Sequence, residues 1–388
     1  MTDPDATLSR CVGDVDAFGR EHWGRTPLLH AGADPAGFAD LLSVDHVDHL
    51  VSSTGLRAPA FRLVRGGKTL PAARYLRRAR VGSRPIDDLA DPGKVFAEFA
   101  DGATIVLQGL QRYWTPLAVF CRALEQALSH PVQANAYLTP PVAAGLNVHA
   151  DAHDVFALQT HGRKQWAVYW DTADTEPRDL TLVPGDALYL PRGTRHAART
   201  VDEASLHITI GVRATTWHDV ASQAVALLAQ DPAHHEPLPM GFAGEPATFT
   251  AQVAARLRDL ASALEKVDAG EVARATVEGF LTGRAPLLDG QLRDLLELDA
   301  ITDDTPLRRR LGAVCALRPR GDRVELLLGD RTLSLPAHAE APLRAVIEAA
   351  VLRPRELAAH LDEPGRLVLA RRLVREGLLR IAREDAPQ

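Results

Sequence analysis

The feature that most restricts the fold of this 388-residue chain is a series of short β-strand patterns between residues 131 and about 213. Segments rich in valine, tyrosine, phenylalanine, isoleucine and threonine alternate there with proline and glycine. They are VQANAYL, VFALQ, KQWAVYW, RDLTLV, DALYLP and ASLHITIGV. Strands this short, separated by turn residues at this spacing, are typical of an antiparallel sandwich or a small barrel. We therefore expect a two-layered β core in this part of the chain.

Two motifs in this β region carry residues that bind metals. In NVHADAHDVFALQTHGRKQW (147–166), His149 and Asp151 stand two positions apart, so on a strand they would face the same side. Downstream, Gly185, Pro191, Gly193 and His196 follow the spacing G-x5-P-x-G-x2-H, which is the second signature of cupin-type β-sandwiches. We predict that His149, Asp151 and His196 form one metal site.

The composition of this ligand set indicates which metal it would hold. Two histidines and one carboxylate occupy one face of an octahedron and leave three positions open, as in non-haem Fe(II) oxygenases that bind a bidentate co-substrate and dioxygen together. A structural zinc site would close all four positions, usually with thiolates, and no cysteine lies near these residues in the sequence. The pattern therefore favours iron(II) with an organic co-substrate.

Three other polar residues of the first motif are expected to serve different ends. His161 lies beside Gly162 in a turn and should be exposed to solvent. Asp154 begins the next strand and should make local backbone hydrogen bonds. His153 is the rival ligand, but alternate residues of one strand reach the roughly 90° angles of an octahedral face poorly. We expect it to support the site without binding the metal.

Lys164 is the candidate for recognising the co-substrate. It follows the turn at Gly162, so a hairpin would carry it back alongside the metal-binding strand. An ammonium group inside a sandwich needs an anion, which the far carboxylate of a metal-bound dicarboxylate would supply. Asn135 and Tyr137 share one face of the preceding strand and could add neutral hydrogen bonds. Strand parity alone also allows Lys164 to be exposed beside Arg163.

The stretch NAYLTPP…GLNVHADAHDVFALQTHGRKQWAVY resembles the core of the ribosomal oxygenases, the JmjC-related branch of cupin-fold 2-oxoglutarate oxygenases. FGREHWGRTPLL is similar to the N-terminal entry motif of that family. The resemblance implies that His149, Asp151 and His196 bind iron. It also implies that Asn135, Tyr137, Lys164 and, more weakly, Thr209 contact 2-oxoglutarate. Two positions depart from the pattern: Ala150 replaces an aromatic residue, and Thr200 replaces asparagine at a position that is not a ligand.

The implied activity is that of an Fe(II)- and 2-oxoglutarate-dependent dioxygenase that uses dioxygen to hydroxylate a side chain of a protein, first of all a ribosomal protein. One alternative is a tailoring hydroxylase of a small peptide or natural product on the same fold. An alternative of another class is a non-catalytic cupin-like regulator that binds DNA through its C-terminal segment. Succinate formation would separate the enzymes from the regulator.

The rest of the chain predicts an α+β protein in three parts. Residues 1–214 would form the double-stranded β-helix of a cupin or JmjC-type domain with an N-terminal helical entry. Residues 215–295 read as a helical module that offers a homodimer contact. Residues 296–388, with three short strands and two helices, resemble a winged-helix domain.

Composition limits which partners the protein is expected to bind and in which compartment it is expected to lie. The net charge is −6, no apolar segment approaches the length of a membrane span, and the N-terminus has no secretory signal. Arginine is frequent after residue 306, but acidic residues are interspersed with it, so direct nucleic-acid binding is not expected. Three widely spaced cysteines suit a reducing compartment, so we expect a cytoplasmic protein.

Overall fold

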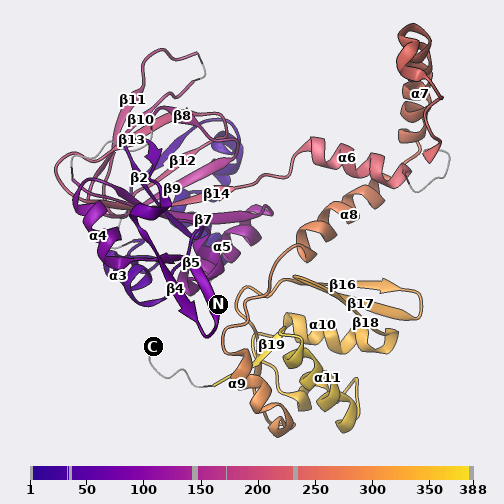
Figure 1. The fold of residues 1–388 in the computed structure, drawn as a ribbon. Helices are drawn as coiled ribbons and strands as arrows, with labels where there is room; N and C mark the ends of the chain where they lie inside the picture. The colour runs from indigo at the N-terminus through magenta and orange to yellow at the C-terminus, as the bar shows by residue number, and fades with distance from the viewer. Residues whose placement is uncertain are drawn as a thin grey trace. The chain divides into compact units, whose positions relative to one another are not determined.

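The structure is a computed structural model that describes residues 3–32, 34, 37–141, 147–171, 173–229 and 235–383 (Figure 1). The chain divides into two compact units, Met1–Ala214 and Thr215–Gln388, and each is described by itself. The boundary coincides with the end of the first expected domain at residue 214. The further division at residue 295 stays a prediction.

The first unit is built on an eight-stranded antiparallel sheet. Its strands lie in the order β1 (Leu28–His30), β12 (Ala187–Leu190), β9 (Asp154–His161), β14 (Ser205–Val212), β7 (Val132–Thr139), β6 (Thr104–Leu107), β2 (Phe61–Arg65) and β3 (Lys68–Thr69). β14 pairs with both β7 and β9, so segments distant in sequence are adjacent at the centre of the sheet.

A smaller antiparallel sheet forms the second layer. Its strands lie in the order β11 (Arg178–Leu182), β10 (Lys164–Val168), β13 (Arg195–Arg199) and β8 (His149–Ala150). A turn at Gly162, whose φ of 60° suits glycine, takes the chain from β9 in the large sheet to β10 in the small one. The two layers confirm the antiparallel β core that the strand patterns predict.

Apolar side chains fill both sides of the large sheet. One cluster joins the two sheets and consists of Val155, Ala157, Trp166, Val168, Leu182, Leu188 and Leu190. A larger cluster packs the other face against helices. These helices are α1 (Pro4–Val12), the short α2 (Val15–Ala17), α3 (Val44–Ser53), α4 (Pro92–Ala100) and α5 (Thr115–Leu128). The apolar spacing of residues 115–128 predicts α5 at its observed bounds.

One hairpin of the first unit has no counterpart in the sequence-based expectations. β4 (Leu76–Val81) and β5 (Arg84–Ala90) form a two-stranded sheet of their own. Seven of their thirteen residues are exposed and five of these are charged, so the alternation of apolar residues that signals a half-buried strand is missing. The turn between β2 and β3 at Gly66 and Gly67, by contrast, agrees with the glycine pair in the sequence.

The second unit begins with three helices and ends with a small α/β region. The helices are α6 (Trp217–Leu228), α7 (Pro246–Leu264) and α8 (Ala269–Thr282). The region that follows contains α9 (Gln291–Leu296), β15 (Leu307–Arg309), β16 (Cys315–Arg320), β17 (Arg323–Leu328), β18 (Thr332–Pro336), α10 (Glu340–Glu348), α11 (Glu363–Arg375) and β19 (Leu379–Ile381). Three antiparallel strands and two longer helices are present, and the winged-helix description of them stays a prediction.

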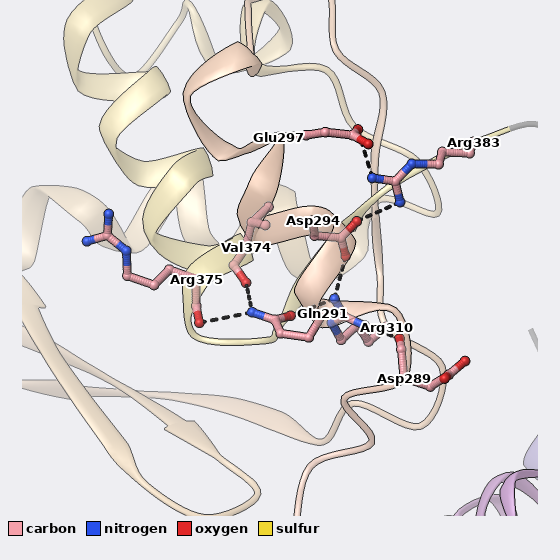
Figure 2. Close-up of polar contacts among 8 residues, drawn as sticks. All are labelled: Asp289, Gln291, Asp294, Glu297, Arg310, Val374, Arg375 and Arg383. Atoms are coloured by element: carbon pink, nitrogen blue, oxygen red, sulfur yellow. Dashed lines mark hydrogen bonds and ion pairs between the residues drawn. The ribbon is translucent and has the colours of Figure 1, made fainter.

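A buried ionic network fixes α9 within the second unit (Figure 2). The carboxylate of Asp294, which is fully buried, pairs with the guanidinium groups of Arg310 and Arg383. Arg310 also donates to Gln291 Oε1 at 2.6 Å, and the Gln291 amide donates to the Val374 carbonyl at 2.9 Å. The network therefore ties α9 to the ends of β15 and α11 and to the segment after β19.

Within the described ranges, no helix has both the length and the apolar character needed to cross a membrane.

Candidate metal centre

The two histidines of the expected ligand set face each other across neighbouring strands. β8 pairs antiparallel with β13 so that His149 lies directly opposite His196, and their ring centroids are 4.4 Å apart. Directly opposed residues of an antiparallel pair project from the same face of the sheet. The pairing of two short strands therefore brings together two imidazoles that are 47 positions apart in the sequence.

Asp151 completes the cluster from the segment just after β8. Its Oδ2 lies 3.7 Å from Nε2 of His196, and the Gly193 amide donates to the Asp151 carbonyl at 2.8 Å. Gly193 belongs to the turn that precedes β13, so this hydrogen bond holds the second ligand segment against the first. One ligand atom from each of His149, Asp151 and His196 lies within 4.8 Å of the others.

Hydrogen bonds fix which ring nitrogen of each histidine is free. Nδ1 of His149 lies 2.9 Å from the Asn147 carbonyl, and Nδ1 of His196 lies 2.9 Å from the Thr194 carbonyl. A carbonyl only accepts, so Nδ1 carries the proton and Nε2 keeps its lone pair for a metal. Burial also lowers the pKa of His196, which keeps this imidazole neutral, as a ligand must be. The donor set therefore fits a divalent metal ion.

The cluster opens onto a cavity of about 230 Å³ between the two sheets. The lining includes Lys164 and Trp166 from β10, Tyr137 and Thr139 from β7, and His207 and Thr209 from β14. It also includes Arg62 from β2. Basic and neutral polar groups predominate, and Asp151 is its only carboxylate among the residues that the structure describes.

Lys164 is a buried cation that faces this cavity. Its side chain is 3% exposed, and Nζ lies 3.0 Å from Thr139 Oγ1 and 3.3 Å from His207 Nδ1. In the described part of the chain, no carboxylate lies within ion-pair distance of it. Removal from water lowers the pKa of Lys164 to about 7. An anion in the cavity would compensate for this lost hydration.

His207 keeps the surroundings of Lys164 neutral. Burial, followed by the nearby Lys164 cation, lowers the pKa of His207 well below its ordinary value. The neutral ring can therefore accept a hydrogen bond at Nδ1 from the lysine ammonium. It stacks on Tyr137 with centroids 5.0 Å apart and planes 8° apart, which fixes its orientation.

The other expected site residues have different positions. Tyr137 and Thr209 line the cavity. Asn135 shares the face of β7 with Tyr137, but its Oδ1 accepts a hydrogen bond from the Gly109 amide at 3.0 Å, and it is not among the lining residues. Contact of Asn135 with 2-oxoglutarate therefore stays a prediction.

The remaining polar residues of the first motif lie outside the cluster. The ring of His153 packs over the backbone of β14, where a Cβ atom on Gly211 would lie 2.6 Å from its Nε2. His161 is exposed at the end of β9. The expectation for Asp154 was wrong. Its buried carboxylate accepts from the Tyr189 hydroxyl and the Arg192 amide, both at 3.1 Å, because the fold brings β12 beside β9.

Sequence reasoning missed several lining residues. Thr139 follows Tyr137 by two positions and His207 precedes Thr209 by two, so strand parity could have found both. Arg62 comes from a strand more than 40 residues before the next polar residue of the pocket, Thr104, and nothing in its neighbourhood in the sequence indicates this role.

Comparison with known proteins agrees with this geometry. A family model for the JmjC domain matches residues 110–220. Ribosomal oxygenase 1 of Gallus gallus is 29% identical over 254 residues, covering 59% of this chain and 41% of the relative. The bifunctional lysine-specific demethylase and histidyl-hydroxylase NO66 of Drosophila pseudoobscura pseudoobscura is 30% identical over 223 residues, covering 53% and 22%. The chain thus matches less than half the length of these curated relatives.

A solved structure has the same fold over nearly the whole chain. The ribosomal oxygenase YcfD of Escherichia coli superposes with a TM-score of 0.54 at 19% identity, and the match covers 95% of this chain and 98% of that one. The two-layered sheet, the His–Asp–His cluster and the family model define a JmjC-domain protein. Within that class, the relatives that the chain resembles in sequence and in fold are described as ribosomal oxygenases and as a histidyl-hydroxylase.

Proposed function

We propose that this protein is an Fe(II)- and 2-oxoglutarate-dependent oxygenase that hydroxylates a side chain of a protein, most specifically of a ribosomal protein. The observation that carries the proposal is the pairing of two features in one cavity. A cluster of two imidazoles and a carboxylate lies at one part of it, and the buried Lys164 ammonium, without a carboxylate partner among the described residues, lines another.

Each group has a defined part in the proposed reaction. His149 and His196 would bind iron through Nε2, and Asp151 through a carboxylate oxygen, which leaves positions for a co-substrate and dioxygen. When bound there, iron would supply the redox chemistry by which one oxygen atom of dioxygen enters a C–H bond and the other enters succinate as 2-oxoglutarate loses carbon dioxide. Lys164, with its Thr139 and His207 contacts, would hold the far carboxylate. YcfD, which has the same fold, has been solved with cobalt and 2-oxoglutarate.

The choice of a ribosomal protein rests on the relatives. Ribosomal oxygenase 1 and YcfD are described as ribosomal oxygenases, and NO66 as a histidyl-hydroxylase. A tailoring hydroxylase of small peptides would use the same cavity. A non-catalytic regulator would have no need of an unpaired lysine in a cavity beside three metal-binding side chains.

The test is turnover of ribosomal proteins. Whole ribosomes are incubated with the protein, Fe(II) and 2-oxoglutarate, and succinate and a mass increase of one oxygen atom are measured. His196→Ala should reduce both by at least about 100-fold, because it removes an iron ligand. His161→Ala, an exposed histidine of the same motif, is the matched control. Normal turnover by His196→Ala would overturn the assignment, and succinate without a protein mass shift would favour the small-molecule hydroxylase.

We further propose that α6 to α8 mediate homodimerisation. No residue of α6 or α7 is buried, and Val272 is the one buried residue described in α8. Large apolar side chains in this segment are exposed, with Trp217 at 87% and Leu257 at 60%. Apolar helix faces of this kind need a partner. Light scattering should give twice the monomer mass, and Leu257→Glu should reduce it to one. We also expect a cytoplasmic location, which fractionation would test.

A further inference from the structure

The most basic part of the protein is a continuous segment of the first unit. Residues 54–86 contain nine arginines and lysines and no aspartate or glutamate, in a chain whose net charge is −6. The remaining residues therefore sum to −15. So strong a local excess of positive charge in an acidic chain is typical of an anion-binding surface.

The structure places much of this charge on the β4–β5 hairpin. Tyr75 and Leu76 anchor its base, and the Tyr75 ring meets the edge of Phe61 at 5.5 Å. Beyond this base most side chains are exposed, and the tip is a turn at Gly82. Arg77, Arg78, Arg80 and Arg84 are all exposed, with the Arg78 side chain at 89%.

An irregularity in the hairpin places acidic residues opposite Arg78. The register shifts between Arg77 and Ala79, where two residues of β5, Asp87 and Asp88, lie opposite the single residue Arg78, as in a β-bulge. Asp87 forms an ion pair with Arg78. Arg77 and Arg80 on the same strand remain exposed.

Only part of this charge is neutralised within the protein. Four arginines form ion pairs, namely Arg57 with Asp88, Arg65 and Arg74 with Glu98, and Arg78 with Asp87. The other five cations have no carboxylate partner among the residues the structure describes. They are Arg62, Lys68, Arg77, Arg80 and Arg84. Three of the five belong to the hairpin.

We propose that the β4–β5 hairpin binds the phosphate backbone of RNA through Arg77, Arg80 and Arg84. The planar guanidinium group donates two parallel hydrogen bonds to phosphate oxygens. The hairpin exposes no aromatic ring for base stacking, so its binding should be independent of sequence. Val81 is its one large exposed apolar side chain, which is too little for insertion into a membrane.

The choice of RNA rests on the proposed function. Proteins that bind ribosomal RNA carry positive charge to neutralise phosphates, so a free ribosomal protein would be repelled by this hairpin. The same protein seated on RNA presents a net negative surface, and the hairpin would then strengthen the encounter. The proposal differs from the sequence-based expectation, drawn from the C-terminal arginines, that the protein does not bind nucleic acid directly; that expectation stays a prediction.

The experiment measures binding of the full chain to a fluorescent single-stranded RNA of roughly 20 nucleotides between about 50 and about 200 mM salt. DNA of the same length and sequence, polyglutamate and anionic vesicles are the competing probes. The test variant is Arg77→Gln/Arg80→Gln/Arg84→Gln. The matched control, Arg258→Gln/Arg293→Gln/Arg375→Gln, removes three exposed arginines of the second unit that form no ion pair among the described residues. Circular dichroism verifies that both variants are folded.

The expected result is a loss of RNA affinity of at least tenfold in the hairpin variant only. The slope of log K against log salt should fall by about 2, since each lost phosphate contact removes about 0.7 from it. Equal RNA binding by wild type and hairpin variant, equal loss in the control, or tighter binding of DNA, polyglutamate or vesicles would overturn the proposal. Succinate formation without ribosomes is measured separately. An RNA-binding protein that forms no succinate would refute the oxygenase proposal alone.

Discussion

Lys164 and Arg310 are both cations removed from water, but the protein treats them in opposite ways. Arg310, 4% exposed, is paired with the buried carboxylate of Asp294 and bonded to Gln291 (Figure 2). Lys164, 3% exposed, meets only the Thr139 hydroxyl and the His207 ring. The charge of Arg310 is neutralised by a carboxylate of the protein itself. The charge of Lys164 is available to an anion that binds in the cavity.

The difference separates a structural charge from a binding charge. A buried ion is expensive to hold without a counter-ion, so a fold that needs it only for packing supplies the partner itself. Where the fold provides no counter-ion for a buried cation, the free energy of ion pairing contributes to the binding of an anionic ligand. Lys164 therefore lowers the stability of the empty protein, while Arg310 with Asp294 holds the second unit together.

The largest expected effect is on the structural charge. Asp294→Ala leaves Arg310 buried without its carboxylate and should reduce the free energy of unfolding by about 3 to 5 kcal/mol. This loss is measured by urea denaturation of the full chain, with unfolding monitored by a spectroscopic probe in the second unit. Asp304→Ala, which removes an exposed pair with Arg355, is the control and should change little. If Asp294→Ala were as stable as wild type, Arg310 and Asp294 would not form a structural ion pair.

Removing the binding charge should have the opposite consequence for stability. Lys164→Met keeps the side-chain volume but eliminates the lone buried cation, so the free protein should be at least as stable as wild type. The same change should weaken the binding of 2-oxoglutarate by about 100-fold or more, because it removes the buried cation that would pair with its far carboxylate. Calorimetry and the KM for 2-oxoglutarate test this, with metal binding as the control for the ligand cluster. A clear loss of stability would mean that Lys164 is structural.

The pH dependence sharpens the comparison further. The pKa of Lys164 is about 7 in the folded protein and 10.5 when exposed, so between these values the unfolded chain binds a proton that the folded one does not. The unfolding free energy of wild type, relative to Lys164→Met, should therefore rise with pH from 7 to 10.5, by up to about 1.4 kcal/mol per unit. Below pH 7 the difference should be constant. Parallel profiles would show that burial does not destabilise this ammonium.

The smallest effect should come from a third cation, Arg163, which stands beside Lys164 in sequence. It is exposed and pairs with Glu203 at 2.8 Å and Asp202 at 3.3 Å. Exposed pairs of this type are screened by solvent and contribute little. Arg163→Gln should leave the melting temperature and the KM for 2-oxoglutarate within experimental error. If Arg163→Gln changed the KM for 2-oxoglutarate as much as Lys164→Met does, the conformation of the turn, and not the Lys164 ammonium, would determine binding of 2-oxoglutarate.

The sequence predicts the candidate site better where residues recur at fixed spacing. The G-x5-P-x-G-x2-H motif and the two-residue period of strands are local patterns, and they place His149, Asp151 and His196 correctly in one cluster. The turn at Gly162 suggests that Lys164 returns alongside the strand of His149, but β10 lies next to β13, which separates it from β8. The two-residue period also does not show that Thr139 and His207 surround Lys164. Those contacts depend on which strands are neighbours, and the order of β7, β14 and β9 is a property of the whole sheet.

Charged residues were harder to interpret than apolar ones. The β4–β5 hairpin could not be predicted from the sequence, because exposed arginines stand where the alternating apolar residues that indicate a strand would be expected. The pairing of Arg310 with Asp294 and Arg383 was equally invisible, since the three residues lie in separate elements whose approach depends on the packing of the second unit. In both cases long-range geometry decides whether a charge is buried, paired or exposed.

The apolar cluster between the two sheets also sets the scale of the site. Val155 and Trp166 belong to this cluster and line the cavity as well, while Leu182 and Leu188 hold the sheets apart behind them. His149, His196 and Lys164 lie on the small sheet, whereas Thr139 and His207 lie on the large one. The cluster therefore sets the separation of the two sheets, and with it how closely Thr139 and His207 approach Lys164.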